Sequence, residues 1–188
     1  MRLFALCSLF ISGMVMADWQ LQQPSAIHFV TTKNTNVSEI HSFNDFDGKV
    51  TAKGEASLNI NLASVDTRIS IRDERMQKHL FELPQFSDAR FEAQIPQDVL
   101  KAATQGQAQM FDLQGTLALH GERAQLQAKV LISANKDNSV TVTSVTPFLV
   151  DAETFTLASG VQKLREIAGL KSISNIVPVT FTLTFAEK

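Results

Sequence analysis

Apolar and polar residues alternate strictly in several short segments of the chain, which limits the structures that it can adopt. In residues 55–62, Ala56, Leu58, Ile60 and Leu62 alternate with polar side chains. Successive side chains of a strand point to opposite faces, so a period of two predicts one buried face and one wet face. The same pattern recurs in residues 89–95, 111–119, 124–132 and 179–185. The chain is therefore expected to consist mainly of half-buried β-strands.

Turn signals separate these segments. Thr35-Asn36, Asp47-Gly48 and His120-Gly121-Glu122 are predicted to be turns, because Asn, Asp and Gly tolerate the positive φ angles that tight turns need. Gly115 lies inside a strand pattern and predicts a bulge or a bend. About seven to nine short strands with turns between them predict an all-β protein, an antiparallel barrel or sandwich.

Two short helices are expected beside the strands. Apolar residues recur at helical spacing over about 70–83, and Ser70 with Asp73 fits a capping box at the start of that helix. Residues 160–170 show a second amphipathic pattern, and residues 96–103 a shorter helical turn. We expect the two helices to pack outside the strands or across one end of them.

The first seventeen residues resemble an export signal rather than part of the fold. Arg2 is followed by the apolar run 3–11, and Val15-Met16-Ala17 offers a small-residue cleavage site. The run is shorter than the roughly 20 residues that span a bilayer. We expect residues 1–17 to be a cleaved signal peptide and residues 18–188 to be a single domain in the bacterial periplasm, with secretion as the alternative. The rival interpretation, an uncleaved anchor, lacks a following stop-transfer segment.

Charge and cysteine content exclude several classes of function. The chain has 17 Lys and Arg against 19 Asp and Glu, whereas a nucleic-acid binder would present a basic surface. Its one cysteine, Cys7, lies in the signal segment. Residues 18–188 therefore cannot form a disulfide, a thiolate metal site or a cysteine nucleophile.

No residues match a catalytic or metal-binding motif. His28, His41, His79 and His120 share no metal-ligand spacing, and the chain has no glycine-rich phosphate loop. We expect a non-enzymatic protein without a cofactor or a metal. A hydrolase that uses Asp73 and His79 is a weaker alternative, because residues six apart on one helix face different directions.

The inward faces of the predicted strands are rich in phenylalanine and aliphatic residues. An eight-stranded barrel can be filled by such side chains, or it can hold one small ligand. A cavity lined in this way would suit a long hydrocarbon, because it offers almost no buried hydrogen-bonding partners. The candidate lining residues are Phe43, Phe46, Leu58, Ile60, Phe91, Phe111, Leu113, Leu117, Phe181 and Leu183.

A basic cluster in the first predicted helix is the candidate site for an anionic head group. Arginine forms bidentate contacts with phosphate, and a helix N-terminus adds free N–H donors. The alternative is a solvated helix face, balanced by Asp73, Glu74 and Glu82. The candidate head-group residues are Arg68, Arg72, Arg75 and His79, with Lys78 beside them.

The ordered set of motifs resembles the YceI family, the lipid- or polyisoprenoid-binding YceI-like domain. The resemblance rests on Ser64-Val65-Asp66-Thr67, Arg72-Asp73, His79-Leu80, Phe86 and Phe91, together with H-x-F-x-x-F-x-G at 41–48 and L-x-G-x-L-x-L-H-G at 113–121. It extends over essentially all of residues 18–188. The residues 148–155 and the helix at 160–170 depart from the pattern of many members.

This resemblance implies an extended, lipocalin-like antiparallel β-barrel in the periplasm. Its interior would bind an isoprenoid, a quinone-like molecule or another long apolar amphiphile. The alternative is a structural or interaction protein of the cell envelope, with a solidly packed barrel and no dedicated ligand. The helix at 160–170 would either cover the cavity or pack against the outside.

Overall fold

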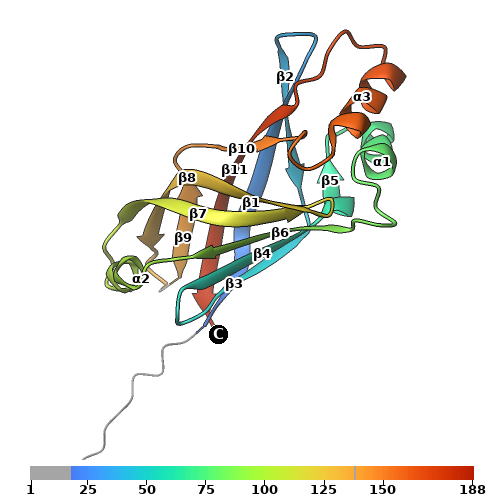
Figure 1. Cartoon of the computed structure of the whole chain (residues 1–188). Coiled ribbons are helices and arrows are strands. Elements are labelled where there is room, and N and C mark those ends of the chain that lie inside the picture. Colours follow the sequence, from blue (N-terminus) through green and yellow to red (C-terminus); the bar gives the residue numbers. More distant parts are fainter. Residues whose placement is uncertain (1–17, 138) are drawn as a thin grey trace, which may run out of the picture.

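The fold is a closed antiparallel barrel of eight strands, seen in a computed structural model that describes residues 18–137 and 139–188 (Figure 1). The predicted signal peptide lies outside the described residues. Every strand pairs with its neighbours in antiparallel register, and the last strand closes the barrel by pairing with the first. In order around the barrel, the strands are β1 (Trp19–Lys33), β3 (Phe46–Val50), β4 (Glu55–Asn61), β6 (Asp88–Gln94), β7 (Gln109–Leu119), β8 (Glu122–Ala134), β9 (Val140–Ser144) and β11 (Ile176–Glu187).

Three further strands extend one end of this barrel. β2 (Val37–Phe43) pairs with the second half of β1, and the short β5 (Val65–Asp66) pairs with β2. β10 (Phe148–Asp151) pairs with the first residues of β11. The prediction of an all-β, lipocalin-like antiparallel barrel is confirmed. None of the predicted strands corresponds to β10.

The helices lie at the two ends of the barrel. α1 (Ser70–His79) and α3 (Ala158–Ile167) lie together at the end that β2, β5 and β10 extend (Figure 1). α2 (Gln97–Thr104) lies at the opposite end, where Leu100 and Ala103 are buried. One turn of 3₁₀ helix, η1 (Leu62–Ser64), connects β4 to β5. The two predicted helices and the predicted short turn are therefore all present.

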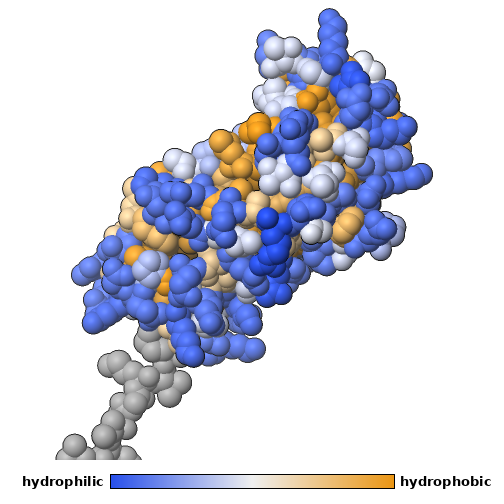
Figure 2. Space-filling model, viewed as in Figure 1, coloured by the Kyte–Doolittle hydropathy of each residue, from blue (hydrophilic) through white to orange (hydrophobic). Residues whose placement is uncertain are grey.

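The hydrophobic core divides into two clusters along the barrel axis. The first cluster fills the α2 end, where Trp19, Val130, Ile132 and Phe185 are buried. The second lies beneath α1 and α3 and is built on the buried residues Phe29, Leu62, Val65, Met76, Phe81, Ala89, Leu117, Leu119, Ala152, Phe155 and Leu157. We call the first region the packed end and the second the helix-covered end. The outer surface is mostly hydrophilic, with hydrophobic atoms gathered along the middle and the helix-covered end of the face in Figure 2.

Gly48 and Gly115, which were predicted to lie in a turn and a bulge, both lie in regularly paired strands. Gly48 lies inside β3, where a side chain would approach the Ser57 carbonyl oxygen to 3.0 Å. The prediction of a turn at Asp47-Gly48 is therefore wrong. β2 and β3 run in the same direction along β1, and the chain reverses at residues 51–54, between β3 and β4. Gly115 stays in regular register with Leu126 and Ala93, so the predicted bulge is also wrong. The ring of Phe91 occupies the space of its missing side chain, because an added Cβ would lie 2.2 Å from the Phe91 Cζ.

The predicted capping box at Ser70 does not form. The residue before α1 is Ile69, and no side chain caps the first turn. The Asp73 carboxylate instead accepts hydrogen bonds from the Thr67 backbone N–H and the Thr67 hydroxyl. A carboxylate in the first turn remains favourable because of the helix dipole. Asp73 thus fixes the 66–69 turn against the helix.

Candidate functional site

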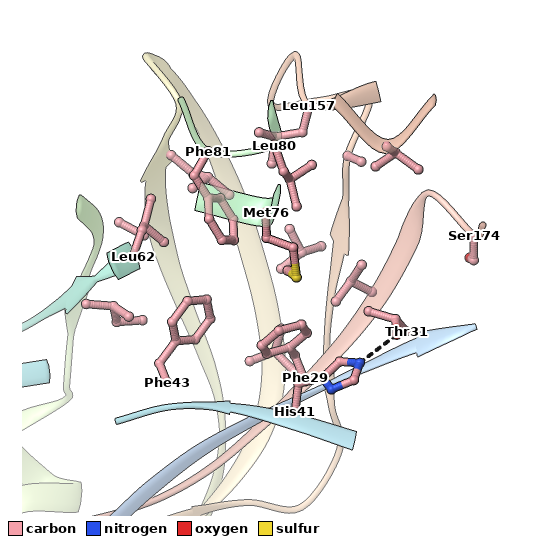
Figure 3. A pocket seen from close by; sticks show the side chains of 18 of the residues that line it. Phe29, Thr31, His41, Phe43, Leu62, Met76, Leu80, Phe81, Leu157 and Ser174 are labelled. Atoms are coloured by element: carbon pink, nitrogen blue, oxygen red, sulfur yellow. Dashed lines mark hydrogen bonds between the residues drawn. The ribbon is translucent and has the colours of Figure 1, made fainter. Parts of the chain in front are cut away.

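A cavity of about 500 Å³ lies inside the helix-covered end (Figure 3). This volume is within the range of ~300–1,000 Å³ that is usual for small-molecule sites. Strands β1, β2, β4, β6, β7, β8, β10 and β11 supply its walls, and α1 and α3 cover it. Its lining is mostly aromatic and aliphatic, and includes Phe29, Leu62, Met76 and Phe81. The barrel is thus filled at the packed end and hollow at the other.

Three phenylalanines lie where the packed end meets the cavity. Phe91 contacts Phe148 edge-on with ring centroids 5.4 Å apart, and Phe148 stacks on Phe181 at 5.9 Å. All three pack with the core of the packed end and also line the cavity. They form its floor. Because such aromatic pairs have preferred geometries, this layer gives the cavity a defined inner limit.

Seven polar residues line the remaining part of the cavity, and we call this set the polar wall. They come from β1, β2, α1 and the segment before β11. They are Thr31, Lys33, Glu39, His41, Arg72, Arg75 and Ser174. On β1 and β2, every second side chain faces the cavity. Those nearer the packed end are apolar, and those farther from it are polar. The cavity therefore has an apolar body and one polar side.

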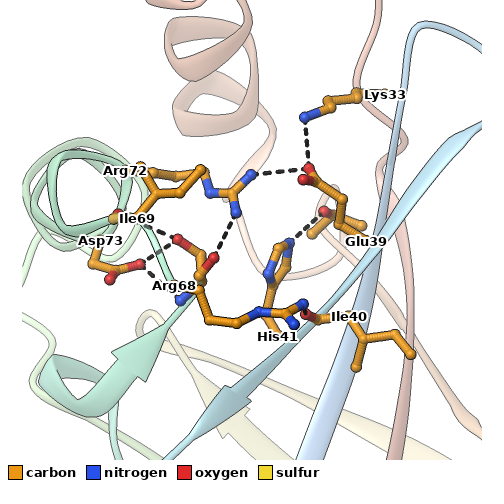
Figure 4. Close-up of polar contacts among 10 residues, drawn as sticks. Lys33, Glu39, Ile40, His41, Arg68, Ile69, Arg72 and Asp73 are labelled. Atoms are coloured by element: carbon orange, nitrogen blue, oxygen red, sulfur yellow. Dashed lines mark hydrogen bonds and ion pairs between the residues drawn. The ribbon is translucent and has the colours of Figure 1, made fainter.

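The ionic part of the polar wall centres on Glu39 (Figure 4). Its Oε2 accepts from Lys33 Nζ at 2.6 Å and from Arg72 Nη1 at 2.9 Å. The hydrogen bond from Lys33, with the charge and hydrogen bond of Arg72, holds the pKa of the Glu39 carboxyl below its usual value despite partial desolvation. Arg72 also donates from Nη2 to the Thr67 carbonyl oxygen at 2.7 Å. The network joins β1, β2 and α1 across one side of the cavity.

His41 is the most deeply buried polar residue of this wall, with 4% of its surface exposed. Its Nε2 lies 2.9 Å from Thr31 Oγ1, and its ring contacts Phe29. Burial lowers the pKa of His41, and the nearby positive charge of Arg72 lowers it further. His41 Nδ1 is buried without a hydrogen-bond partner among the described residues.

The predicted lining residues are divided between the two ends. Phe43, Leu58, Ile60, Phe91, Leu117 and Phe181 line the cavity. The other four pack with the core of the packed end: Phe46, Phe111, Leu113 and Leu183. Phe111, Leu113 and Leu183 lie farther along their strands toward α2, whereas Phe46 is level with Ile60, its partner across β3 and β4. Period-two alternation identifies the inward face of a strand, but it does not say how deep along the barrel a residue lies.

The predicted head-group residues are also divided. Arg72 and Arg75 line the cavity, whereas Arg68 and His79 do not. Arg68 has a positive φ and donates to the Ile40 carbonyl oxygen on the outside of β2. The backbone of His79 lies against Gly160, where a Cβ on the glycine would be 2.5 Å from the His79 carbonyl oxygen. His79 therefore belongs to the contact between α1 and α3.

Sequence reasoning missed the polar members of β1 and β2. Phe29, Thr31 and Lys33 alternate after Ile27, and this spacing alone could have placed them on one face. Glu39 and His41 have the same spacing in the next strand. The helix α3 was predicted, but its position was left open. It covers the cavity, since Val161 and Leu164 line it.

The motif around His120 connects three segments of the chain. The His120 ring lies 4.2 Å from the Phe86 ring, and His120 Nδ1 lies 2.9 Å from Thr156 Oγ1. His120 and Gly121 both have positive φ in the β7–β8 turn, as that hairpin requires. The motif thus joins this turn to the loop after α1 and to the segment before α3.

Neither a metal cluster nor a membrane-spanning helix is found in the described part of the chain. Within residues 18–137 and 139–188, no three His, Asp or Glu side chains gather as a metal ion would require. In the same ranges, no helix is both long and apolar enough to cross a bilayer.

The fold and the cavity together define a lipocalin-like antiparallel β-barrel with an apolar interior. More specifically, the chain belongs to the YceI-like domain family, whose model matches residues 19–185. A comparison with curated proteins gave no match.

Solved structures show the same fold. A polyisoprenoid-binding domain from Saccharophagus degradans, implicated in plant cell wall breakdown, is 32% identical, with a TM-score of 0.85 over 90% of this chain and 98% of its own. BcnA from Burkholderia cenocepacia is 20% identical, with a TM-score of 0.66 over 85% of this chain and 95% of its own. The YCEI protein of Campylobacter jejuni is 16% identical, with a TM-score of 0.54 over 79% and 84%. The last two support the fold alone.

Proposed function

We propose that this protein is a non-enzymatic periplasmic carrier that holds a long apolar amphiphile, such as an isoprenoid or a quinone-like lipid, inside its barrel. The observation that carries the proposal is the cavity of about 500 Å³, with its apolar body and its polar wall on one side. The polyisoprenoid-binding domain that is 32% identical supports this class of ligand. The proposed location rests on the export signal expected in residues 1–17.

The lining is suited to a hydrocarbon chain for a physical reason. Burial of apolar surface contributes roughly 25 cal/mol per Å², and a chain inserted against Phe29, Met76 and Phe81 would bury surface on both sides. A sugar or an amino acid would instead lose its hydrogen bonds to water in the apolar body. The polar end of an amphiphile has partners only along the polar wall.

The direct test is native mass spectrometry of protein purified from its host, followed by organic extraction. We expect a mass above that of the chain, which extraction removes and which analysis identifies as a lipid. Protein that is consistently empty and does not take up geranylgeraniol in solution would contradict the proposal.

A cavity-filling variant provides the matched control. Leu164→Trp on α3 places a larger side chain in the cavity and should abolish uptake of geranylgeraniol. Leu149→Trp makes the same change on β10 at an exposed position and should leave uptake unchanged. Equal uptake by both variants would place the lipid outside the cavity.

A further inference from the structure

Positive charge exceeds negative charge among the residues that line the cavity. The lining contains three positively charged residues, Lys33, Arg72 and Arg75, and one negatively charged residue, Glu39. Glu39 is shared between Lys33 and Arg72 through a single oxygen. Arg75 forms no ion pair or side-chain hydrogen bond with any described residue. The polar wall therefore holds more cationic charge than its own carboxylate balances.

Unused hydrogen-bonding atoms gather in the same wall. Arg72 Nε is buried and has no partner in the described part of the chain, although both terminal nitrogens of that guanidinium are bonded. His41 Nδ1 is also buried and unpaired, in a residue that is 4% exposed. An unpaired buried polar group is destabilising. Arg72 Nε and the guanidinium of Arg75 are donors only, so the partner they require is an acceptor.

From this balance we propose that the polar wall receives an anionic oxygen group, a carboxylate or a phosphate, at the polar end of the bound amphiphile. Arg72 and Arg75 supply its charge-assisted hydrogen bonds, and His41 lies beside it as a neutral donor from Nδ1. When Thr31 donates its hydroxyl proton to His41 Nε2, the ring carries its own proton on Nδ1. This inference rests on the proposed function and adds the chemical class of the head group.

Of the three arginines in this segment, two line the cavity and one does not. Arg72 and Arg75 are three residues apart on α1 and so lie on the same side of the helix. Arg68 precedes the helix and bonds to the outside of β2. The structure therefore offers Arg68 as a matched control, close in sequence and outside the cavity.

The test compares three probes with the same isoprenoid tail and different head groups. They are geranylgeraniol, geranylgeranoic acid and geranylgeranyl phosphate, and their dissociation constants are measured by titration calorimetry on the full chain. A charge-assisted hydrogen bond contributes about 1.5–3 kcal/mol, so each anionic probe should bind at least about tenfold more tightly than the alcohol. Inorganic phosphate alone should not compete, because it lacks the tail.

The variants assign the preference to named side chains. Arg75→Met should reduce the preference for both anionic probes over geranylgeraniol by about tenfold. Arg72→Met should do the same, with thermal unfolding as a check, since Arg72 also bonds to Thr67 and Glu39. Arg68→Met should leave all three affinities unchanged.

The outcomes separate this inference from the proposed function. If geranylgeraniol binds as tightly as the anionic probes, or if Arg75→Met does not alter the preference, the head-group inference is wrong. The proposed function as a lipid carrier would still stand. Competition by inorganic phosphate would show an anion site independent of any lipid, and would also overturn the inference. If no probe with a tail binds, the proposed function itself fails.

Discussion

The two ends of the barrel are built from similar residues but are packed differently. At the packed end, Val130 and Ile132 are completely buried and α2 covers the barrel with Leu100 and Ala103. At the helix-covered end, equally apolar residues such as Phe43 and Leu164 are only partly buried and surround a cavity of about 500 Å³. One barrel therefore has a closely packed core at one end and a cavity at the other.

The separation follows from strand pairing. At the packed end, the eight strands close completely, so their inward side chains meet across a narrow interior. At the other end, β4 gives way to η1 and β9 stops at Ser144, while β2, β5 and β10 widen the wall. Helices α1 and α3 cover this wider opening without filling it. The predictions below test this division.

The largest effect is expected from truncating a core residue at the packed end. Ile132→Ala should lower the free energy of unfolding by about 2–5 kcal/mol, because the side chain is 1% exposed and its neighbours cannot collapse into the space. Leu164→Ala, beside the existing cavity, should cost about 1 kcal/mol or less, since fewer packed contacts are lost. Urea denaturation measures both. Similar losses for the two variants would remove the distinction between the ends.

A second prediction concerns the contact between α1 and α3. Gly160→Ala should destabilise the protein by about 1–3 kcal/mol, because the new Cβ would meet the His79 carbonyl oxygen and the Leu80 Cα. Helix propensity alone predicts the opposite sign, a gain of about 1 kcal/mol. Thermal unfolding shows whether the Gly160→Ala variant is less stable or more stable than the parent protein. Ser159→Ala, at the neighbouring exposed position, is the control and should not destabilise the protein. A stabilised Gly160→Ala variant would mean that the two helices are not in close contact.

The third prediction is a pH dependence that originates at the helix-covered end. Folding lowers the pKa of His41 below its ordinary value of 6.5, so the unfolded chain binds a proton more readily than the native one. The free energy of unfolding should therefore fall as the pH decreases from 6.5 toward the lower folded-state pKa. Denaturation across this range should show a smaller slope for His41→Phe than for the parent protein. The exposed His28→Phe is the control, and an unchanged slope in His41→Phe would contradict the assignment.

The smallest effect is expected on the outer face of the packed end. Lys129 pairs with Asp112 at 2.8 Å, but both side chains are about half exposed. Exposed ion pairs contribute roughly 0.2–1 kcal/mol, so Lys129→Met should alter the free energy of unfolding by less than about 1 kcal/mol. A loss comparable to that of Ile132→Ala, measured by the same urea denaturation, would show that the packed end is not held mainly by its core.

Much of the architecture could be predicted from the sequence, because strand alternation is a local property. The strands around Leu58, Leu117 and Phe181 follow a period of two, and the barrel they form was predicted together with both of its covering helices. Gly48 and Gly115 were misassigned for a non-local reason. Each glycine makes room for atoms of a neighbouring strand, and nothing in its own segment indicates that neighbour.

The candidate site was harder to predict than the fold. Alternation places Phe111, Leu113 and Leu183 inside the barrel, but only the register of all the strands shows that they lie at the packed end. The polar wall combines β1, β2 and α1, which meet only in the folded chain. Arg68 and Arg72 are four residues apart, and a positive φ at Arg68 turns the first away from the cavity.

Methyl NMR of methionine gives the most direct test of where the ligand lies. Met76 is buried and lines the cavity (Figure 3). Met110 is the other methionine in the described part of the chain, and it is 58% exposed at the start of β7. With ¹³C-methyl methionine, titration with geranylgeraniol should shift the Met76 signal and leave the Met110 signal in place. A shift of Met110 alone, or saturable binding without a change at Met76, would contradict a ligand held in the hollow end of the barrel.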